Sequence, residues 1–244
     1  MVSLDSLPAL DQDMHVHSTF SDGVGTIEEN LAVAESRGLT RVTCVDHVRA
    51  STEWAGEFVR EVRRVAARTE VMLRCGIEAK LLDVDGNLDL PRDCGDPDYI
   101  YIADHQVPLP DGPADPRRVR DAIAAGRLAA PTVVAALLEA TKNALRQVEN
   151  AVIAHLFSVL PKLGLEEGEV PIGAIEVLAR VAAATGAAVE IDERWRCPSA
   201  RTLRPFLDAG VPILLSTDSH APEAIGRYGY CLEVRDALVL GGGR

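Results

Sequence analysis

Six histidines are the side chains of this sequence whose positions most strongly indicate chemistry. They are His15, His17, His47, His105, His155 and His220. Each lies at or just beyond the carboxyl end of a segment that the sequence predicts to be a β-strand. The carboxyl ends of parallel strands meet at one face of an α/β barrel, so these imidazoles are expected to share that face. One histidine at such a place is usually an ordinary polar residue, but six of six predict a common site.

Three carboxylates accompany these histidines. Asp22 follows His17 closely in a turn, where the alternative role is that of an ordinary turn aspartate. Glu78 ends an apolar strand, where a carboxylate is costly unless it is paired or bound to a metal. Asp218 stands just before the last histidine. Imidazole and carboxylate together suit divalent ions such as zinc, iron and manganese, and nine such ligands predict two or three ions.

The order of these motifs along the chain is more specific than any single motif. The sequence runs through Asp13-x-His15-x-His17-Ser-Thr-Phe-Ser-Asp22-Gly23, Asp46-His47, Gly76-Ile77-Glu78, His105, His155 and Asp218-x-His220. In order and spacing this set resembles the PHP family, named for polymerase and histidinol phosphatase, over residues 10 to 234. The resemblance implies a distorted seven-stranded β/α barrel with a trinuclear metal site. The implied metal ligands are His15, His17, Asp22, His47, Glu78, His105, His155, Asp218 and His220.

Three features depart from the family pattern. Asp104 precedes His105 at a place where a small or apolar residue is expected, and it is either a carboxylate that supports a ligand or a substrate contact. The run Glu190-Ile191-Asp192 stands where the family often has Glu-x-Asn. The chain ends soon after Val234, which predicts that the final helix of many members is short or absent. These differences bear on the substrate more than on the metal ligands.

The chemistry that such a site predicts is attack on a phosphate ester. Two or three divalent ions (zinc, manganese or iron) lower the pKa of bound water, so a metal-bound hydroxide is the predicted nucleophile and no side chain is assigned that role. Glu78 is the predicted bridging carboxylate. Phosphate recognition calls for cations near the ions, and the candidates are Arg194, Arg227 and Lys80, each of which could instead be a solvated surface charge. Trp195 is placed either to stack on a substrate ring or to pack in the protein.

Short apolar segments alternate with helical patterns along the chain. A capping box at Thr26 opens a predicted helix that should stop at Gly38. Repeated β-then-α units predict a parallel sheet, and seven of them favour a closed or nearly closed barrel over an open doubly wound sheet. The predicted fold is therefore α/β, a distorted seven-stranded (β/α)7 TIM-like barrel in one domain, residues 1–244, with 106–150 as a helical insertion or lid. The predicted strands are 14–17, 41–45, 71–77, 99–103, 151–154, 187–191 and 211–216, with one more at 230–234.

Composition narrows the function classes. The chain has 244 residues and a net charge of −12, which disfavours a sequence-independent grip on nucleic acid. No apolar run of about 18 residues is present, so no membrane partner is expected. The five cysteines form no CxxC pair, and the first ten residues show no secretory pattern. Both observations predict a cytoplasmic location.

The function predicted from these features is metal-dependent hydrolysis of a phosphate ester of a small metabolite, as in a histidinol phosphatase. The predicted partner is a small phosphorylated substrate, and the oligomeric state is left open. A metal-dependent nuclease or proofreading exonuclease of the same fold is the main alternative, followed by a non-catalytic metal-binding module. An amidohydrolase also begins with H-x-H but usually needs a bridging lysine and a lone aspartate on an eighth strand, which this sequence fits poorly.

Overall fold

Seven parallel strands form the central sheet of the computed structural model, which describes residues 7–240. In their order across the sheet they are β1 (Gln12–Val16), β2 (Arg41–His47), β3 (Met72–Lys80), β4 (Tyr99–Ala103), β7 (Ala151–Ile153), β8 (Ala188–Asp192) and β9 (Ile213–Ser216). The two edges meet beyond the end of β9, where the N–H of His17 donates to the carbonyl of Ser219 at 2.8 Å. Val16 and Ser219 form a parallel bridge at the same place. The strands therefore make a nearly closed barrel, and the predicted TIM-like fold is confirmed.

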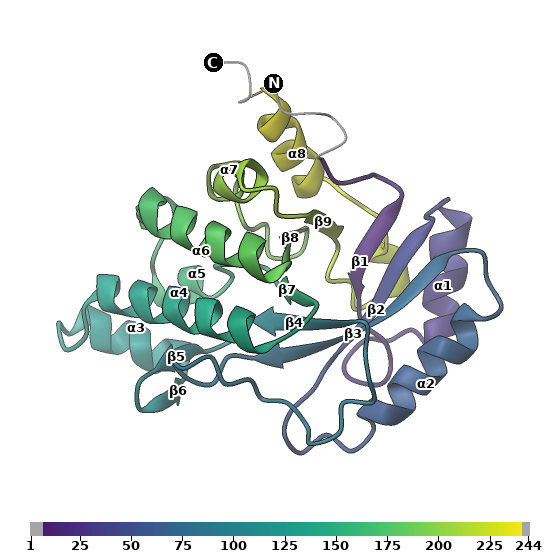
Figure 1. The fold of residues 1–244 in the computed structure, drawn as a ribbon, viewed down its shortest axis with the longest axis horizontal. Helices are drawn as coiled ribbons and strands as arrows, with labels where there is room; N and C mark the ends of the chain where they lie inside the picture. Colours follow the sequence, from purple (N-terminus) through teal and green to yellow (C-terminus); the bar gives the residue numbers. More distant parts are fainter. Residues whose placement is uncertain (1–6, 241–244) are drawn as a thin grey trace.

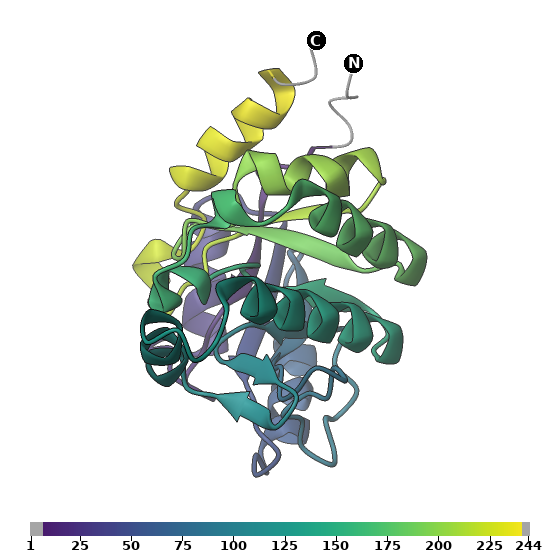
Figure 2. The ribbon, with the colours of Figure 1, turned by 90° about the vertical axis from the view of Figure 1, so that its left-hand side faces the viewer.

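Helices cover the outside of this barrel on two sides (Figure 1). One side carries α1 (Ile27–Ser36) and α2 (Ala55–Ala66), and the other carries α4 (Ala130–Gln147), α6 (Ile172–Thr185) and α7 (Ala200–Asp208). The capping box at Thr26 is present at the start of α1. Figure 2 shows that α4, α6 and α7 follow one another along the outer face, and α8 (Tyr230–Leu240) continues the row. Short turns of helix are α5 (Leu160–Leu163), η2 (Glu167–Glu169) and η3 (Pro222–Ala224).

Two predictions about the end of the chain are wrong. Residues 230–234 form no strand, because they begin helix α8, and this helix also contradicts the expectation that a final helix is short or absent. Cys231, Val234 and Leu238 recur at helical spacing and are buried. They bury an apolar stripe against the outer core that contains α6 and α7. The tertiary contact thus decides between helix and strand where the short local pattern did not.

The segment 106–150 combines an added hairpin with an ordinary crossover helix. The hairpin is β5 (Val107–Leu109) and β6 (Gly112–Ala114), and α3 (Pro116–Ala124) follows it. Helix α4 then packs on the barrel and leads into β7, as a connection between parallel strands requires. Figure 1 places the hairpin and α3 beyond the carboxyl ends of β3 and β4. A lid function for this segment, and the single-domain boundary, stay predictions.

None of the helices in residues 7–240 combines the length and apolar character that crossing a membrane requires.

Candidate metal centre

The register of the strands directs the candidate groups into the barrel. Val45 of β2 is paired with Gly76 of β3, and both lie at the level of the Tyr101 ring inside the barrel. A Cβ at position 76 would lie 2.7 Å from that ring, so the bulk of Tyr101 requires glycine opposite it. Side chains alternate along a strand, so His47 and Glu78, the next inward positions, face the interior nearer the carboxyl ends.

Glu78 lies at the middle of a ring of imidazoles. Its side chain is buried, and its two carboxylate oxygens lie within 3.6 Å of nitrogens from five histidines. The distances are 2.7 Å to His47 Nδ1, 2.9 Å to His155 Nε2, 3.2 Å to His105 Nε2, 3.5 Å to His15 Nε2 and 3.6 Å to His17 Nε2. One carboxylate thus joins side chains from β1, β2 and the ends of β4 and β7.

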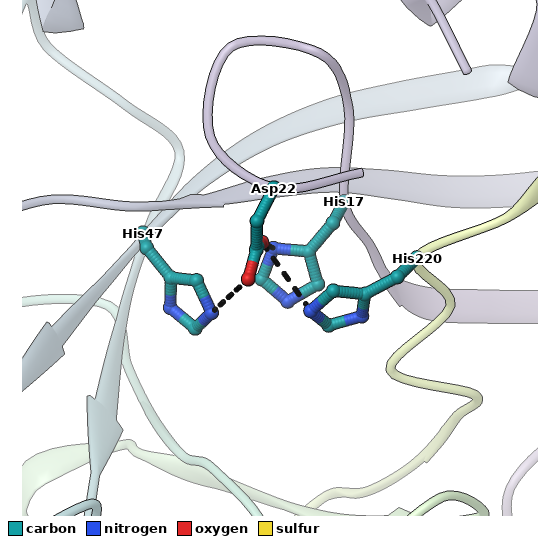
Figure 3. Close-up of side chains that lie close together, drawn as sticks. All are labelled: His17, Asp22, His47 and His220. Atoms are coloured by element: carbon teal, nitrogen blue, oxygen red, sulfur yellow. Dashed lines mark ion pairs between the residues drawn. The ribbon is translucent and has the colours of Figure 1, made fainter. Parts of the chain in front are cut away.

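Two aspartates and the last histidine complete the other half of the cluster. Asp218 Oδ1 lies 2.9 Å from His17 Nε2 and 3.4 Å from His220 Nδ1. Asp22 lies between His47 and His220, with His17 behind it (Figure 3), at 3.3 Å from His220 Nε2 and 3.7 Å from His47 Nε2. All nine predicted ligands are therefore brought into one connected cluster, hereafter the nine-residue cluster. Their role as ligands stays a prediction.

The unpartnered atoms of this cluster test whether it fits a metal. His15 Nε2, both ring nitrogens of His17, Glu78 Oε2 and Asp218 Oδ1 are buried and make no hydrogen bond of acceptable geometry to any described residue. Buried polar atoms are normally paired, so several that face one another without a bond call for a shared partner. Triads in which the candidate ligand atoms lie within 4.8 Å of one another include His15, His17 and Asp218. Nitrogen and carboxylate donors so arranged fit divalent cations.

The pKa values show how the cluster divides its charge. Burial lowers the pKa of His17 to about 4, which leaves its imidazole neutral at pH 7. Burial also lowers the pKa of His105. Burial opposes the charged carboxylate of Glu78, but the surrounding imidazoles, His105 first among them, outweigh this and hold its pKa well below the usual range. Burial opposes charge on His15, His47 and His155 as well, but nearby carboxylates outweigh it and raise their pKa values. A neutral His17 beside an ionised Glu78 already suits a cation, whereas binding to the raised histidines would displace their protons.

Two carboxylates outside the nine-residue cluster contact its histidines. Glu190 is buried and contacts both His15 Nδ1, at 3.1 Å, and the backbone N–H of His155, at 2.7 Å. Asp104, one of the departures from the family pattern, accepts a hydrogen bond from Ser158 Oγ and lies 3.4 Å from His155 Nδ1. The sequence alone assigns no role to Glu190. The signal that could have found it is a charged residue between Val189 and Ile191 in a buried strand.

The three cations predicted to bind phosphate are placed differently. Arg194 donates to His220 Nδ1 and lies 3.4 Å from the carbonyl oxygen of Asp218, so it adjoins the nine-residue cluster. Lys80 ends β3 on the same face as Glu78, and its ammonium makes no ion pair within the described residues. Arg227 is exposed and likewise has no ion-pair partner between residues 7 and 240. The geometry thus links one of the three directly to the cluster.

Trp195 connects the cluster to a second cation that the sequence analysis did not single out. The indole N–H of Trp195 donates to Asp218 Oδ2 at 2.8 Å, and the Lys162 ammonium lies 4.1 Å from the centre of the indole ring. A cavity of about 490 Å³ opens beside them, lined in part by Phe157 and Arg196. Trp195 therefore contacts the cluster through Asp218 and also lines this cavity. In the sequence, the only signal that Lys162 lies near the cluster is its position shortly after His155.

Comparisons with known proteins support the fold. No model of a protein family matches the sequence, and a search of curated proteins finds no match either. Among solved structures, a histidinol phosphate phosphatase from Lactococcus lactis subsp. lactis matches with a TM-score of 0.59 and 16% identity, over 95% of this chain and 93% of its own. That structure was determined with zinc, L-histidinol and phosphate. A protein from Listeria monocytogenes described as a candidate histidinol phosphatase matches with a TM-score of 0.63 and 12% identity, over 91% and 99%.

The fold and the cluster together define a TIM-like barrel with a candidate metal centre at the carboxyl ends of its strands. More narrowly, the barrel has the fold of histidinol phosphatases, the enzymes that supply part of the PHP family's name. The resemblance predicted from the motifs is therefore confirmed at the level of the fold.

Proposed function

We propose that this protein is a metal-dependent phosphatase that hydrolyses the phosphate monoester of a small metabolite. The observation that carries the proposal is the convergence of the nine-residue cluster around Glu78, whose oxygens lie within 3.6 Å of five histidine nitrogens. A cluster of this composition has no evident structural purpose, because it buries unpartnered polar atoms in the barrel.

The proposed cofactors are two or three divalent ions, with zinc, manganese or iron as the candidates. The nine-residue cluster would hold them, and the zinc in the Lactococcus structure supports the choice of metal class. Bound there, such ions would lower the pKa of water towards neutrality and offset the charge of a phosphate.

The chain's own residues orient the substrate and the ligands. Arg194, beside His220, offers N–H donors to the phosphate oxygens, and its planar group suits two of them at once. Lys80 and Arg227 are proposed as weaker contributors at the rim. The indole N–H of Trp195 holds one oxygen of Asp218, which leaves Oδ1 directed at His17. The barrel wall keeps the rings of His15, His17 and His155 out of bulk water, which strengthens their interactions with charge.

The size of the substrate follows from the setting of the cluster. His15, His17 and His155 are buried, so only a group that enters the barrel mouth can reach them. The cavity beside Trp195 offers about 490 Å³ for the remainder of a small molecule. The L-histidinol and phosphate bound to the Lactococcus enzyme make L-histidinol phosphate the first compound to test.

The experiment that tests this proposal combines metal analysis with a hydrolysis screen on the same sample. Purified protein should contain divalent metal and release phosphate from p-nitrophenyl phosphate, with L-histidinol phosphate and other phosphorylated metabolites assayed beside it. Chelation should abolish turnover, and added manganese or zinc should restore it. Preferred cleavage of single-stranded DNA would show a nuclease instead. Bound metal without any hydrolysis would show a non-catalytic metal-binding protein.

A further inference from the structure

Glu190 is the buried carboxylate that the proposed chemistry does not use. It lies in β8, and its side chain is fully buried. Val189 and Ile191, on either side, pack into the outer core under the helices, so Glu190 must point into the barrel. An ionisable group at such a place needs partners that compensate for its lost hydration.

Its first partner is the ring of His15. The distances from His15 Nδ1 are 3.1 Å to Glu190 Oε2 and 3.3 Å to Oε1. A carboxylate can only accept a hydrogen bond, so in the neutral ring that a cation requires Nδ1 keeps the proton and Nε2 carries the lone pair. The other nitrogen, Nε2, then faces Glu78 at 3.5 Å and has no hydrogen-bond partner among residues 7–240. The contact with Glu190 thus directs the lone pair of Nε2 towards the candidate centre.

Its second partner is the backbone of His155. The N–H of His155 donates to Glu190 Oε1 at 2.7 Å. His155 has a φ of 28°, in the left-handed region that a residue with a side chain rarely adopts. Such a conformation persists only where its surroundings impose it. This backbone geometry brings His155 Nε2 to 2.9 Å from Glu78, on the opposite oxygen from His15.

We infer that Glu190 is a positioning residue for the proposed metal centre: it aims His15 through Nδ1 and fixes His155 through its backbone N–H. One carboxylate thereby sets the direction of two of the nine side chains, which come from β1 and from the end of β7. The inference rests on the proposed metal centre. Its competitor is that Glu190 itself binds a cation, since donor atoms of His15, Glu190 and Asp192 also lie within 4.8 Å of one another.

The substitution Glu190→Gln separates these roles. A glutamine has the same shape but no charge and only one acceptor oxygen, which would have to accept from both the Nδ1–H of His15 and the N–H of His155, and its NH₂ group can only donate. We expect metal affinity, measured by competition with a chromophoric chelator, to fall about 10–100-fold, the usual cost of losing a group that orients a ligand. Glu193→Gln is the matched control. It removes the same charge only three residues away, from a carboxylate that accepts from the backbone N–H groups of Tyr230 and Cys231 and makes no contact with the nine-residue cluster. Circular dichroism checks that both variants are folded.

A measurement on the unmodified chain keeps the inference testable even if the variant does not fold. In zinc-loaded protein with ¹⁵N-labelled histidine, His15 should show a slowly exchanging proton on Nδ1 and a metal-shifted Nε2. A metal-shifted Nδ1 would overturn the inference and favour Glu190 as a ligand. Equal metal affinity in Glu190→Gln and Glu193→Gln would also overturn it while leaving the proposed function intact. Absence of bound metal in the unmodified protein would overturn both.

Discussion

At the scale of single residues, Glu78 is the side chain on which the candidate centre depends. It is only 2% exposed, and the imidazoles around it keep its pKa well below the usual range. We expect Glu78→Gln, which retains the shape and removes the charge, to lower turnover of p-nitrophenyl phosphate at least about 100-fold, since losing a mere orienting partner costs about 10–100-fold. Metal analysis should show fewer bound ions. Glu139→Gln, at an exposed ion pair with Lys142, is the control, and full activity with full metal content in Glu78→Gln would contradict the proposal.

Arg194 adjoins His220 and its side chain is partly exposed, so it is placed to contact a ligand at the cluster. Arg194→Ala should raise KM for a phosphate monoester about 10-fold, the equivalent of one charge-assisted hydrogen bond, and change kcat less. Arg196→Ala removes a neighbouring arginine whose ion pair is with Glu233, and it should leave KM nearly unchanged. Steady-state kinetics measure both variants. An unchanged KM in Arg194→Ala would remove this side chain from phosphate binding.

At the scale of elements, the sequence predicted the strands well because each carries a short apolar segment with a polar group at its end. Strand β4 has the predicted bounds, and most of the others differ by one to three residues at an end. The sequence predicts a strand at 230–234 because Tyr230 to Val234 is too short a window to separate the helical period of apolar residues from the strand period. Besides the apolar stripe that α8 buries, Glu193 supports its start from far away in sequence, because its carboxylate accepts from the N–H groups of Tyr230 and Cys231 at 3.0 and 2.9 Å.

That contact gives a prediction about stability. Burial raises the pKa of Glu193, but the bonds from Cys231 and Tyr230 outweigh it, and the pKa is lowered overall. A carboxyl group with a depressed folded-state pKa stabilises the fold above its unfolded pKa, about 4.3, and loses this contribution as the pH falls. Glu193→Ala should therefore lower the free energy of unfolding by about 1 kcal/mol at pH 7 and by less near pH 4. Urea unfolding at both pH values measures this, and an equal loss at both would show that the charge is not what matters.

At the scale of the whole molecule, the sequence indicates which residue types converge but not what each one touches. Strand order and the shared face could be predicted from the repeated β-then-α units, because parallel strands must end together. The bond between His15 and Glu190 joins residues 175 positions apart, and no local pattern encodes it. The same holds for Lys162 over Trp195, which depends on how α5 packs against the loop that follows β8. Pairings of this kind arise only when the barrel closes.

Closure of the barrel also links metal binding to the stability of the fold. Folding without a cation buries ring nitrogens and carboxylate oxygens that have no partner within the described chain, so a bound ion should stabilise the folded state strongly. At a metal concentration 1,000 times the Kd, binding contributes about 4 kcal/mol, which raises Tm by about 10 °C in a chain of this size. The gain should shrink as the pH falls from 7.5 to 5.5: burial opposes charge on His15 and His155, but nearby carboxylates raise their pKa values well above the ordinary value, and the protons must leave before metal binds. Calorimetric scans with and without chelator at pH 7.5 and 5.5 measure this, with Glu78→Gln as the variant that should lose the gain. Equal melting temperatures with and without metal would contradict a cation in the cluster.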